Sequence, residues 1–291
     1  MFFKCLPWEY GIRNLFRRPV RSGLTLVALS TVILLVFVVV GFIRGLERSL
    51  DVSGDPNTVI IFSQGMGENL EYSSISRQAA GLVIASFDGI EERYGKKYAS
   101  PELYLGTQVR LTPDGPPGMG LIRGVIPAAL LVHSDVQIIE GDWPKPGEVL
   151  VGRLAATKMG VAKEAVRLGE TLWFEGRAWK ISGVFAAKGS VYESESWCRL
   201  DDLQQALKRD DLSLSLVALR MGPGLEFEDI AEFCKVRTNL KLSAIRQVDY
   251  FNTLQEDYAP VRMLAWVVVI LISGAGMFAG LNMMYGSVVG R

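Results

Sequence analysis

The chain has 291 residues, of which 31 are basic and 31 acidic, so its formal net charge is zero. Balanced charge without a local run of lysine or arginine excludes a broad basic surface, and no nucleic-acid partner is expected. The single histidine, His133, excludes metal sites with two histidine ligands, and we expect it to be an ordinary polar residue after the apolar run 128–132.

The first predicted element is a short amphipathic helix. Its apolar positions recur with helical spacing, and they are Trp8, Ile12, Leu15 and Phe16. Arginines occupy another face, which is typical of a helix in the membrane interface. Residues 1–21 are therefore predicted to form a cytoplasmic, basic, amphipathic helix. A basic flank without this structure is the alternative.

The first predicted membrane span covers residues 22–44, where no charged residue occurs between Ser22 and Ile43. A helix of this length crosses a hydrocarbon core of roughly 30 Å. A signal peptide has a shorter apolar region and a cleavage site of small residues, which GFIRGLERSLD lacks. Basic residues are concentrated before the span, so the positive-inside rule places the N-terminus in the cytoplasm and residues 45–259 outside.

Residues 45–259 are predicted to form a mixed α and β domain. The β-type runs lie at 58–62, 103–111, 121–126, 136–139, 148–151, 171–174, 178–185 and 214–220, and the helical patterns at 75–87, 153–159, 201–209 and 225–238. The turn 175–177 predicts a β-hairpin. The Pro/Gly-rich loop 112–118 either separates two subdomains or caps a hairpin.

Four acidic residues of this domain are candidates for a functional site, and they are Glu193, Glu195, Asp201 and Asp202. They could bind a cation or exchange protons. A solvated loop, with Asp201 or Asp202 as the N-cap of helix 201–209, explains them as well, and we favour it. The glycines of 147–152 resemble a phosphate loop, but Arg153 and Leu154 replace its lysine and hydroxyl residue. We therefore expect no catalytic residue, metal or cofactor.

The three cysteines are Cys5, Cys198 and Cys234, and none forms a C-x-x-C pair. On the predicted topology Cys5 is cytoplasmic and the other two lie outside. An oxidising compartment permits a disulfide between Cys198 and Cys234, but two buried thiols are favoured.

Helical patterns continue outward from both spans. Arg44–Leu50 is predicted to extend the first span, and Val248–Arg262 to lead directly into the second, with a bend at Pro260. The second span is predicted over 260–286. Gly276 and Gly280 form a G-x-x-x-G pattern, which lets another helix approach closely, although glycine is also common in membrane helices.

Several short segments, spread over most of the chain, follow one another in a characteristic order. They are 12–22, 140–148, 151–153, 168–170, 181–185, 189–197, 200–204, 282–284, 287–288 and Arg291. In this order and with this topology they resemble the permease subunits of the MacB/FtsX-like ABC transporters. The resemblance implies an α+β fold class, with two transmembrane helices bracketing a MacB-like periplasmic core in the bacterial inner membrane.

The same resemblance implies a non-catalytic permease of an exporting or mechanotransmitting type. Its implied partners are a cytoplasmic ABC ATPase subunit, a second permease copy, the lipid bilayer and a periplasmic adaptor protein. In the family the loop after the second span contacts the ATPase, so Ser287, Val288, Val289, Gly290 and Arg291 are expected to begin that contact. Because the family has four spans, the chain is expected to be a fragment that lacks the last two.

Two other functions are compatible with two spans and an outer domain. A membrane-anchored sensor or ligand-binding module is the main alternative, and it requires a cytoplasmic output domain. An ectoenzyme ranks last, because the sequence contains no catalytic constellation.

Overall fold

A computed structural model describes residues 19–65, 69–208 and 213–289. The predicted interfacial helix, with Trp8, Ile12, Leu15 and Phe16, lies outside the described residues, as do Gly290 and Arg291. Contacts divide the chain into two compact units. We call Met1–Arg48 with Gln255–Arg291 the helix unit, and Ser49–Leu254 the sheet unit, and each is described by itself.

The helix unit contains most of α2 (Pro19–Ser53) and of α9 (Ala259–Val289). Both helices contain segments long and apolar enough to cross a membrane, namely Leu26–Ser53 and Ala259–Asn282. Large apolar side chains such as Phe37 and Phe278 are exposed along them. Exposed apolar surface of this extent is typical of contact with lipid or with another helix.

The helical extension beyond Arg44 is confirmed, because α2 continues to Ser53. The second predicted extension is interrupted. α8 (Gln247–Asp257) ends one residue before Tyr258, and α9 begins at Ala259. Pro260 supplies the physical reason, since it has no N–H to donate to a preceding turn.

The strands described in the sheet unit form one ten-stranded sheet, in the order β12-β1-β11-β4-β5-β10-β7-β9-β6 with β8 paired to β9, and a separate β2–β3 hairpin. Their bounds are β1 (Thr58–Ser63), β2 (Glu92–Arg93), β3 (Lys96–Lys97), β4 (Ala99–Val109), β5 (Gly118–Val125), β6 (Gln137–Gly141), β7 (Glu148–Gly152), β8 (Thr171–Phe174), β9 (Arg177–Ala186), β10 (Glu195–Arg199), β11 (Leu216–Arg220) and β12 (Leu242–Arg246).

Strand β4 joins the two halves of this sheet. Its first residues pair with β11, and Leu103–Val109 pairs antiparallel with β5. Val109 lies opposite Gly118, so the loop 112–118 caps a hairpin rather than separating two subdomains. The predicted hairpin of β8 and β9 is also confirmed. Glu175 and Gly176 both have positive φ there, as a two-residue type I′ turn requires.

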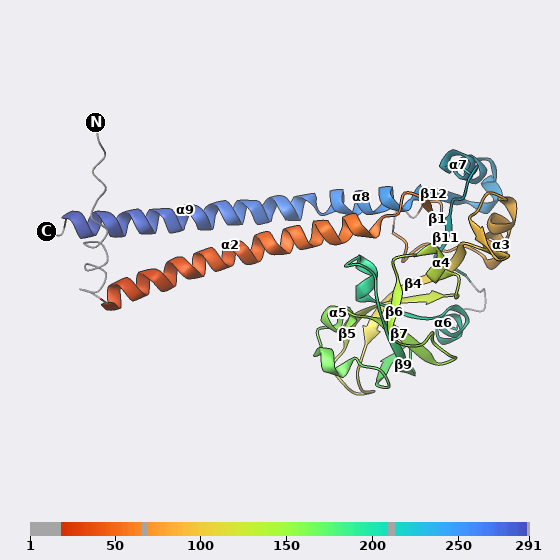
Figure 1. Ribbon diagram of the computed structural model, residues 1–291, viewed down its shortest axis with the longest axis horizontal. Helices are drawn as coiled ribbons and strands as arrows, with labels where there is room; N and C mark the ends of the chain where they lie inside the picture. The colour runs from red at the N-terminus through yellow and green to blue at the C-terminus, as the bar shows by residue number, and fades with distance from the viewer. Residues whose placement is uncertain (1–18, 66–68, 209–212, 290–291) are drawn as a thin grey trace. The chain divides into compact units, whose positions relative to one another are not determined.

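Helices and short turns cover the sheet, as Figure 1 shows for α3 and α7 beside β1, β11 and β12 and for α5 and α6 beside β5 and β7. Their bounds are α3 (Arg77–Ser86), α4 (Ala129–Val132), α5 (Ala155–Met159), α6 (Leu200–Ala206), α7 (Phe227–Val236), and the 3₁₀ turns η1 (Lys163–Ala165), η2 (Val191–Ser194) and η3 (Thr238–Leu240). Alternate residues of β1 enter two separate apolar clusters, Val59 and Ile61 in one and Ile60 and Phe62 in the other. Both faces of β1 are therefore buried.

The helix cap predicted for α6 is wrong, and two strands of the large sheet were missed. The N-cap of α6 is Arg199, and neither Asp201 nor Asp202 caps the helix, because both lie in its first turn. Strands β10 and β12 were not predicted. Their sequences, ESWCR and LSAIR, alternate too weakly in hydropathy to indicate strands.

Cys198 and Cys234 are both free and buried, so the two-thiol alternative is correct. Burial raises the pKa of both thiols, that of Cys234 to about 11. The thiol form therefore predominates at neutral pH, and both side chains belong to the apolar core.

Candidate functional site

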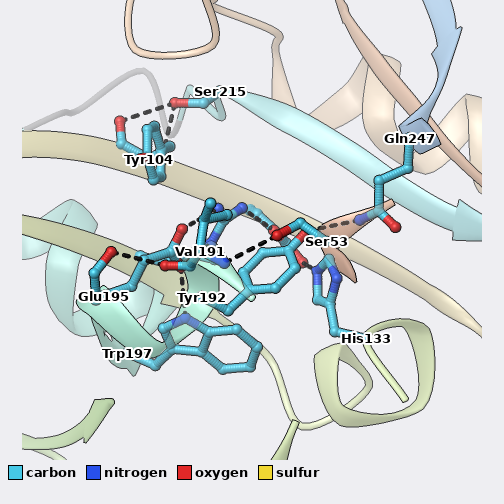
Figure 2. A network of polar contacts seen from close by, with 12 residues as sticks. Ser53, Tyr104, His133, Val191, Tyr192, Glu195, Trp197, Ser215 and Gln247 are labelled. Carbon is cyan, nitrogen blue, oxygen red and sulfur yellow. Dashed lines mark hydrogen bonds and ion pairs between the residues drawn. The ribbon is translucent and has the colours of Figure 1, made fainter. Parts of the chain in front are cut away.

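A buried ion cluster lies at the centre of the sheet unit, on three neighbouring strands (Figure 2). Arg123 on β5 donates from Nε and Nη2 to both carboxylate oxygens of Glu195 on β10, at 2.7 and 2.6 Å. Its Nη1 donates to Oε2 of Glu102 on β4 at 2.7 Å. The three residues are at most 6% exposed. Because β5 lies between β4 and β10, one guanidinium can bind both carboxylates.

Aromatic side chains enclose this cluster. The guanidinium carbon of Arg123 lies 4.7 Å from the ring centroid of Tyr104 and 5.3 Å from that of Tyr192. Trp197 donates from Nε1 to Glu195 at 2.8 Å. Rings at these distances stabilise the cation through their π electrons. The cluster is therefore a fixed part of the interior.

His133 completes the cluster through Glu102. Its Nε2 lies 2.8 Å from Oε1 of Glu102, and both side chains are buried. Burial raises the pKa of Glu102, but the charges and hydrogen bonds of His133 and Arg123 more than offset it and lower the pKa to about 2. Glu102 is thus a carboxylate at neutral pH. The expectation that His133 is an ordinary polar residue missed these contacts.

Glu193 is held in a second polar arrangement around η2. Its carboxylate accepts hydrogen bonds from the N–H groups of Ala187 and Gly189, at 2.8 and 3.0 Å, and from Nε of Arg153 at 2.5 Å. Burial opposes ionisation of Glu193, yet these donors lower its pKa. These three hydrogen bonds to the Glu193 carboxylate fix the loop that leads into η2.

The interpretation of the four acidic residues as a solvated loop is therefore wrong for most of them. Glu193 and Glu195 are buried in ion pairs, and Asp202 is 8% exposed and accepts a hydrogen bond from the N–H of Gly147. Asp201 is exposed and pairs with Arg77. Among the described residues no group of three or more His, Cys, Asp and Glu side chains could hold a metal ion.

Beside the ion cluster, two segments are hydrogen-bonded to η2. One precedes β1 and the other follows β12. We call this place the junction, and it comprises Ser53, Gly54, Asp55, Val191, Tyr192, Gln247 and Val248. Oγ of Ser53, the last residue of α2, accepts a hydrogen bond from the N–H of Val191 at 2.9 Å. Nε2 of Gln247, the first residue of α8, donates to the hydroxyl of Tyr192 at 2.6 Å.

The two chain segments of the junction also contact each other. Oε1 of Gln247 accepts a hydrogen bond from the N–H of Asp55 at 3.0 Å. Between them, Gly54 packs against Val248 so closely that a Cβ on Gly54 would lie 2.8 Å from the Cα of Val248. Only glycine permits this approach of two backbones. The end of α2 and the start of α8 are therefore fixed to each other and to η2.

The junction and the ion cluster share one side chain. Tyr192 binds Gln247 through its hydroxyl and lies against Arg123 and His133 through its ring, 4.8 Å from the His133 ring centroid. The charges of Arg123, Glu102 and Glu195 are paired with one another, which suits a rigid connection. The geometry can hold the two segments at one position on the sheet.

In the helix unit, the predicted packing residue Gly276 lies against α2. A Cβ on Gly276 would be 3.1 Å from Cγ1 of Val32, whereas a Cβ on Gly280 would have no atom within 4 Å. Ser287, Val288 and Val289 are the last described residues of α9. Their contact with an ATPase, and the role of both glycines, remain predictions.

The sequence contains signals for the ion cluster that its apolar context obscures. Arg123 interrupts the apolar strand LIRGV, and Glu102 precedes LYLG. A single charge inside a strand pattern indicates either an exposed face or a buried ion pair. The junction residues carry no comparable signal.

Comparisons with known proteins address the fold. No protein-family model matches the chain, and none of the curated proteins matches it. Among solved structures it is similar to the periplasmic region of MacB from Actinobacillus actinomycetemcomitans, with a TM-score of 0.52 and 10% identity, over 70% of this chain and 94% of that chain. The extracellular domain of the noncanonic ABC-type transporter YknZ from Gram-positive bacteria has a TM-score of 0.48 and 13% identity, over 65% of this chain and 100% of that chain.

These observations define a class of fold: a mixed α and β sheet domain bracketed by two apolar helices. More particularly, the sheet unit has the fold of the MacB-type periplasmic domain, as the resemblance in sequence implied.

Proposed function

We propose that the chain is the transmembrane permease subunit of an ABC transporter and depends on a separate ATPase for energy. The observation that carries the proposal is the MacB-type fold of the sheet unit together with a membrane-length apolar helix at each of its ends. Fold alone is a weak guide to function. Here the two helices add the membrane context that a permease requires.

In this proposal the protein is a multi-pass protein of the bacterial inner membrane. The basic residues before α2 support a cytoplasmic N-terminus under the positive-inside rule, with residues 45–259 outside. The last residues of α9, with Gly290 and Arg291, then return to the cytoplasm and begin the contact with the ATPase.

The junction is the proposed point at which motion of α2 and α9 reaches the sheet. α2 is one uninterrupted helix from Pro19 to Ser53, and Ser53 itself is bonded to η2. On the other side α8 begins at Gln247, which is bonded to both η2 and Asp55. Displacement of either helix end would therefore act on Tyr192 and the ion cluster. A second permease copy and a periplasmic adaptor complete the proposed assembly.

Purification of the native complex tests the proposal. The chain, tagged and expressed from its own gene, is extracted from membranes in mild detergent. We expect an ABC ATPase to co-purify and the complex to hydrolyse ATP. Replacement of residues 287–291 by glycine and serine should abolish co-purification, whereas the exposed substitution Lys158→Glu in α5 should not. A complex without any ATPase would contradict the proposal.

A further inference from the structure

A small, partly open cavity lies within the sheet unit beside the junction. Its volume is about 30 Å³, and four segments line it: 52–55 at the end of α2, 132–136 after α4, Ser190 and Tyr192 at η2, and Gln247 of α8. A water molecule needs roughly 10–15 Å³ of such volume and two to four polar partners. The cavity is therefore large enough for one water.

Two residues that line this cavity each have a buried polar atom without a hydrogen-bond partner among the described residues. The two atoms are Nδ1 of His133 and Oγ of Ser190. His133 is 6% exposed and Ser190 is 2% exposed. Unpaired polar atoms this deeply buried are rare in folded proteins, and a bound water is the commonest partner.

The orientation of His133 is fixed from its other nitrogen. Glu102 is a carboxylate, which can only accept, so Nε2 carries the proton of their hydrogen bond. The ring also packs against Tyr192 and Trp197, with centroids 4.8 and 5.7 Å away. The ring position is thus fixed, and Nδ1 is the ring nitrogen left without a partner in the described part of the chain. It accepts a hydrogen bond from a water when the ring is neutral and donates one when the ring is charged.

The other charged groups near the cavity disfavour a cation. Asp135 pairs with Lys188 at 2.6 Å, and Asp55 pairs with Arg220 at 3.4 Å. An imidazole nitrogen and a hydroxyl group do not match the oxygen sets that hard cations bind. A hydroxyl group that both donates and accepts suits water.

We propose that this cavity is a binding site for one structural water molecule, which bridges Nδ1 of His133 and Oγ of Ser190. Through it, the ion cluster is linked to the residue that precedes η2. The site is independent of the proposed function, since it requires only the fold of the sheet unit.

Because His133 is the single histidine of the chain, ¹⁵N-histidine labelling reports on this site alone. In the full-length chain in lipid bilayers, solid-state NMR can measure magnetisation transfer from water protons to the His133 ring. We expect clear transfer in the wild type and its loss in Ser190→Val, which fills the cavity and removes the hydroxyl. Ser194→Ala is the control, because Oγ of Ser194 bonds to the carbonyl of Val191 and does not line the cavity.

Absence of transfer in the wild type, or unchanged transfer in Ser190→Val, would overturn the proposal. If Ser190→Val fails to fold, a map of the wild-type chain that resolves ordered water decides the matter. We expect one peak at about 2.7–3.2 Å from both atoms. A dry cavity, a direct bond between the two side chains, or a peak with the shorter distances of a cation would refute the site.

Discussion

Different interactions stabilise the interior of the sheet unit and the interior of the helix unit. In the sheet unit, charges such as Arg123 and Glu195 are buried, paired and enclosed by aromatic rings. In the helix unit, the ion pair of Arg262 with Glu47 is partly exposed, and Gly276 approaches a single side chain, Val32. Large apolar side chains on α2 and α9 remain exposed.

This difference indicates which part of the molecule can change its internal packing. A buried ion cluster cannot lose one member without leaving an unpaired charge, so it defines one arrangement. Helices that touch through small residues and side-chain methyl groups can shift with little loss. The sheet unit is thus suited to act as a rigid body, and the helix unit to change its packing.

The largest effect on stability is expected when the central cation of the sheet unit is removed. Arg123→Met leaves the carboxylates of Glu102 and Glu195 buried without their partner. We expect a loss of about 3–5 kcal/mol and a fall of about 10 °C in the unfolding midpoint, measured by tryptophan fluorescence of the full chain in detergent.

The matched control for this variant is Arg167→Met. Arg167 is 63% exposed and pairs with Glu164 at 3.4 Å, so its loss should change stability by less than about 0.5 kcal/mol. Adding Glu102→Gln and Glu195→Gln to Arg123→Met should recover part of the loss. Equal midpoints for the two arginine variants would show that the cluster does not stabilise the sheet unit.

Acid should weaken the same cluster. The pKa of Glu102 is lowered from 4.5 to about 2 in the folded protein, so between these values the folded state binds fewer protons than the unfolded state. The stabilisation is complete above about pH 4.5 and is lost as the pH falls toward 2, by on the order of a few kcal/mol. As the pH falls through this range, the unfolding midpoint of Glu102→Gln should fall less steeply than that of the wild type. The midpoint of the exposed control Glu164→Gln should fall as steeply as that of the wild type. Identical slopes in all three proteins would contradict the account.

Gly54→Ala tests the junction. The added Cβ would lie 2.8 Å from the backbone Cα of Val248, which cannot yield without moving α8. We expect destabilisation of about 1–3 kcal/mol, seen as a lower unfolding midpoint. Gly81→Ala in α3 has no atom within 4 Å of the added Cβ and should gain about 0.5–1 kcal/mol. If Gly54→Ala were also neutral or stabilising, the close approach would have no structural role.

Gly276→Ala tests how tightly the helix unit is packed, and its expected effect on stability is the smallest of the four predictions. Its Cβ would meet a methyl group of Val32 at 3.1 Å, and a side chain can yield by a few tenths of an ångström. The helix propensity of alanine offsets this strain, so we expect a change within about 0.5 kcal/mol. A loss as large as that of Gly54→Ala would show that the helix unit is as tightly packed as the sheet unit.

Much of the fold could be predicted from the sequence, because its signals are local. Uncharged runs predicted α2 and α9, and the turn 175–177 predicted the hairpin of β8 and β9. The pairing of distant strands could not be predicted, and it alone brings Glu102, Arg123 and Glu195 together. The junction depends in the same way on contacts between Ser53, Val191 and Gln247, which are far apart in the chain.

The most direct test of the central claim is whether ATP-driven motion reaches the sheet through the junction. One spin label would be placed at exposed Ser86 of α3 in each permease copy of the full transporter, with Cys5→Ser, while Cys198 and Cys234 are buried and remain. We predict that the distance between the labels changes on ATP binding. Gln247→Leu with Tyr192→Phe should keep ATP hydrolysis and lose this distance change. An unaltered distance change in that double variant would contradict the account.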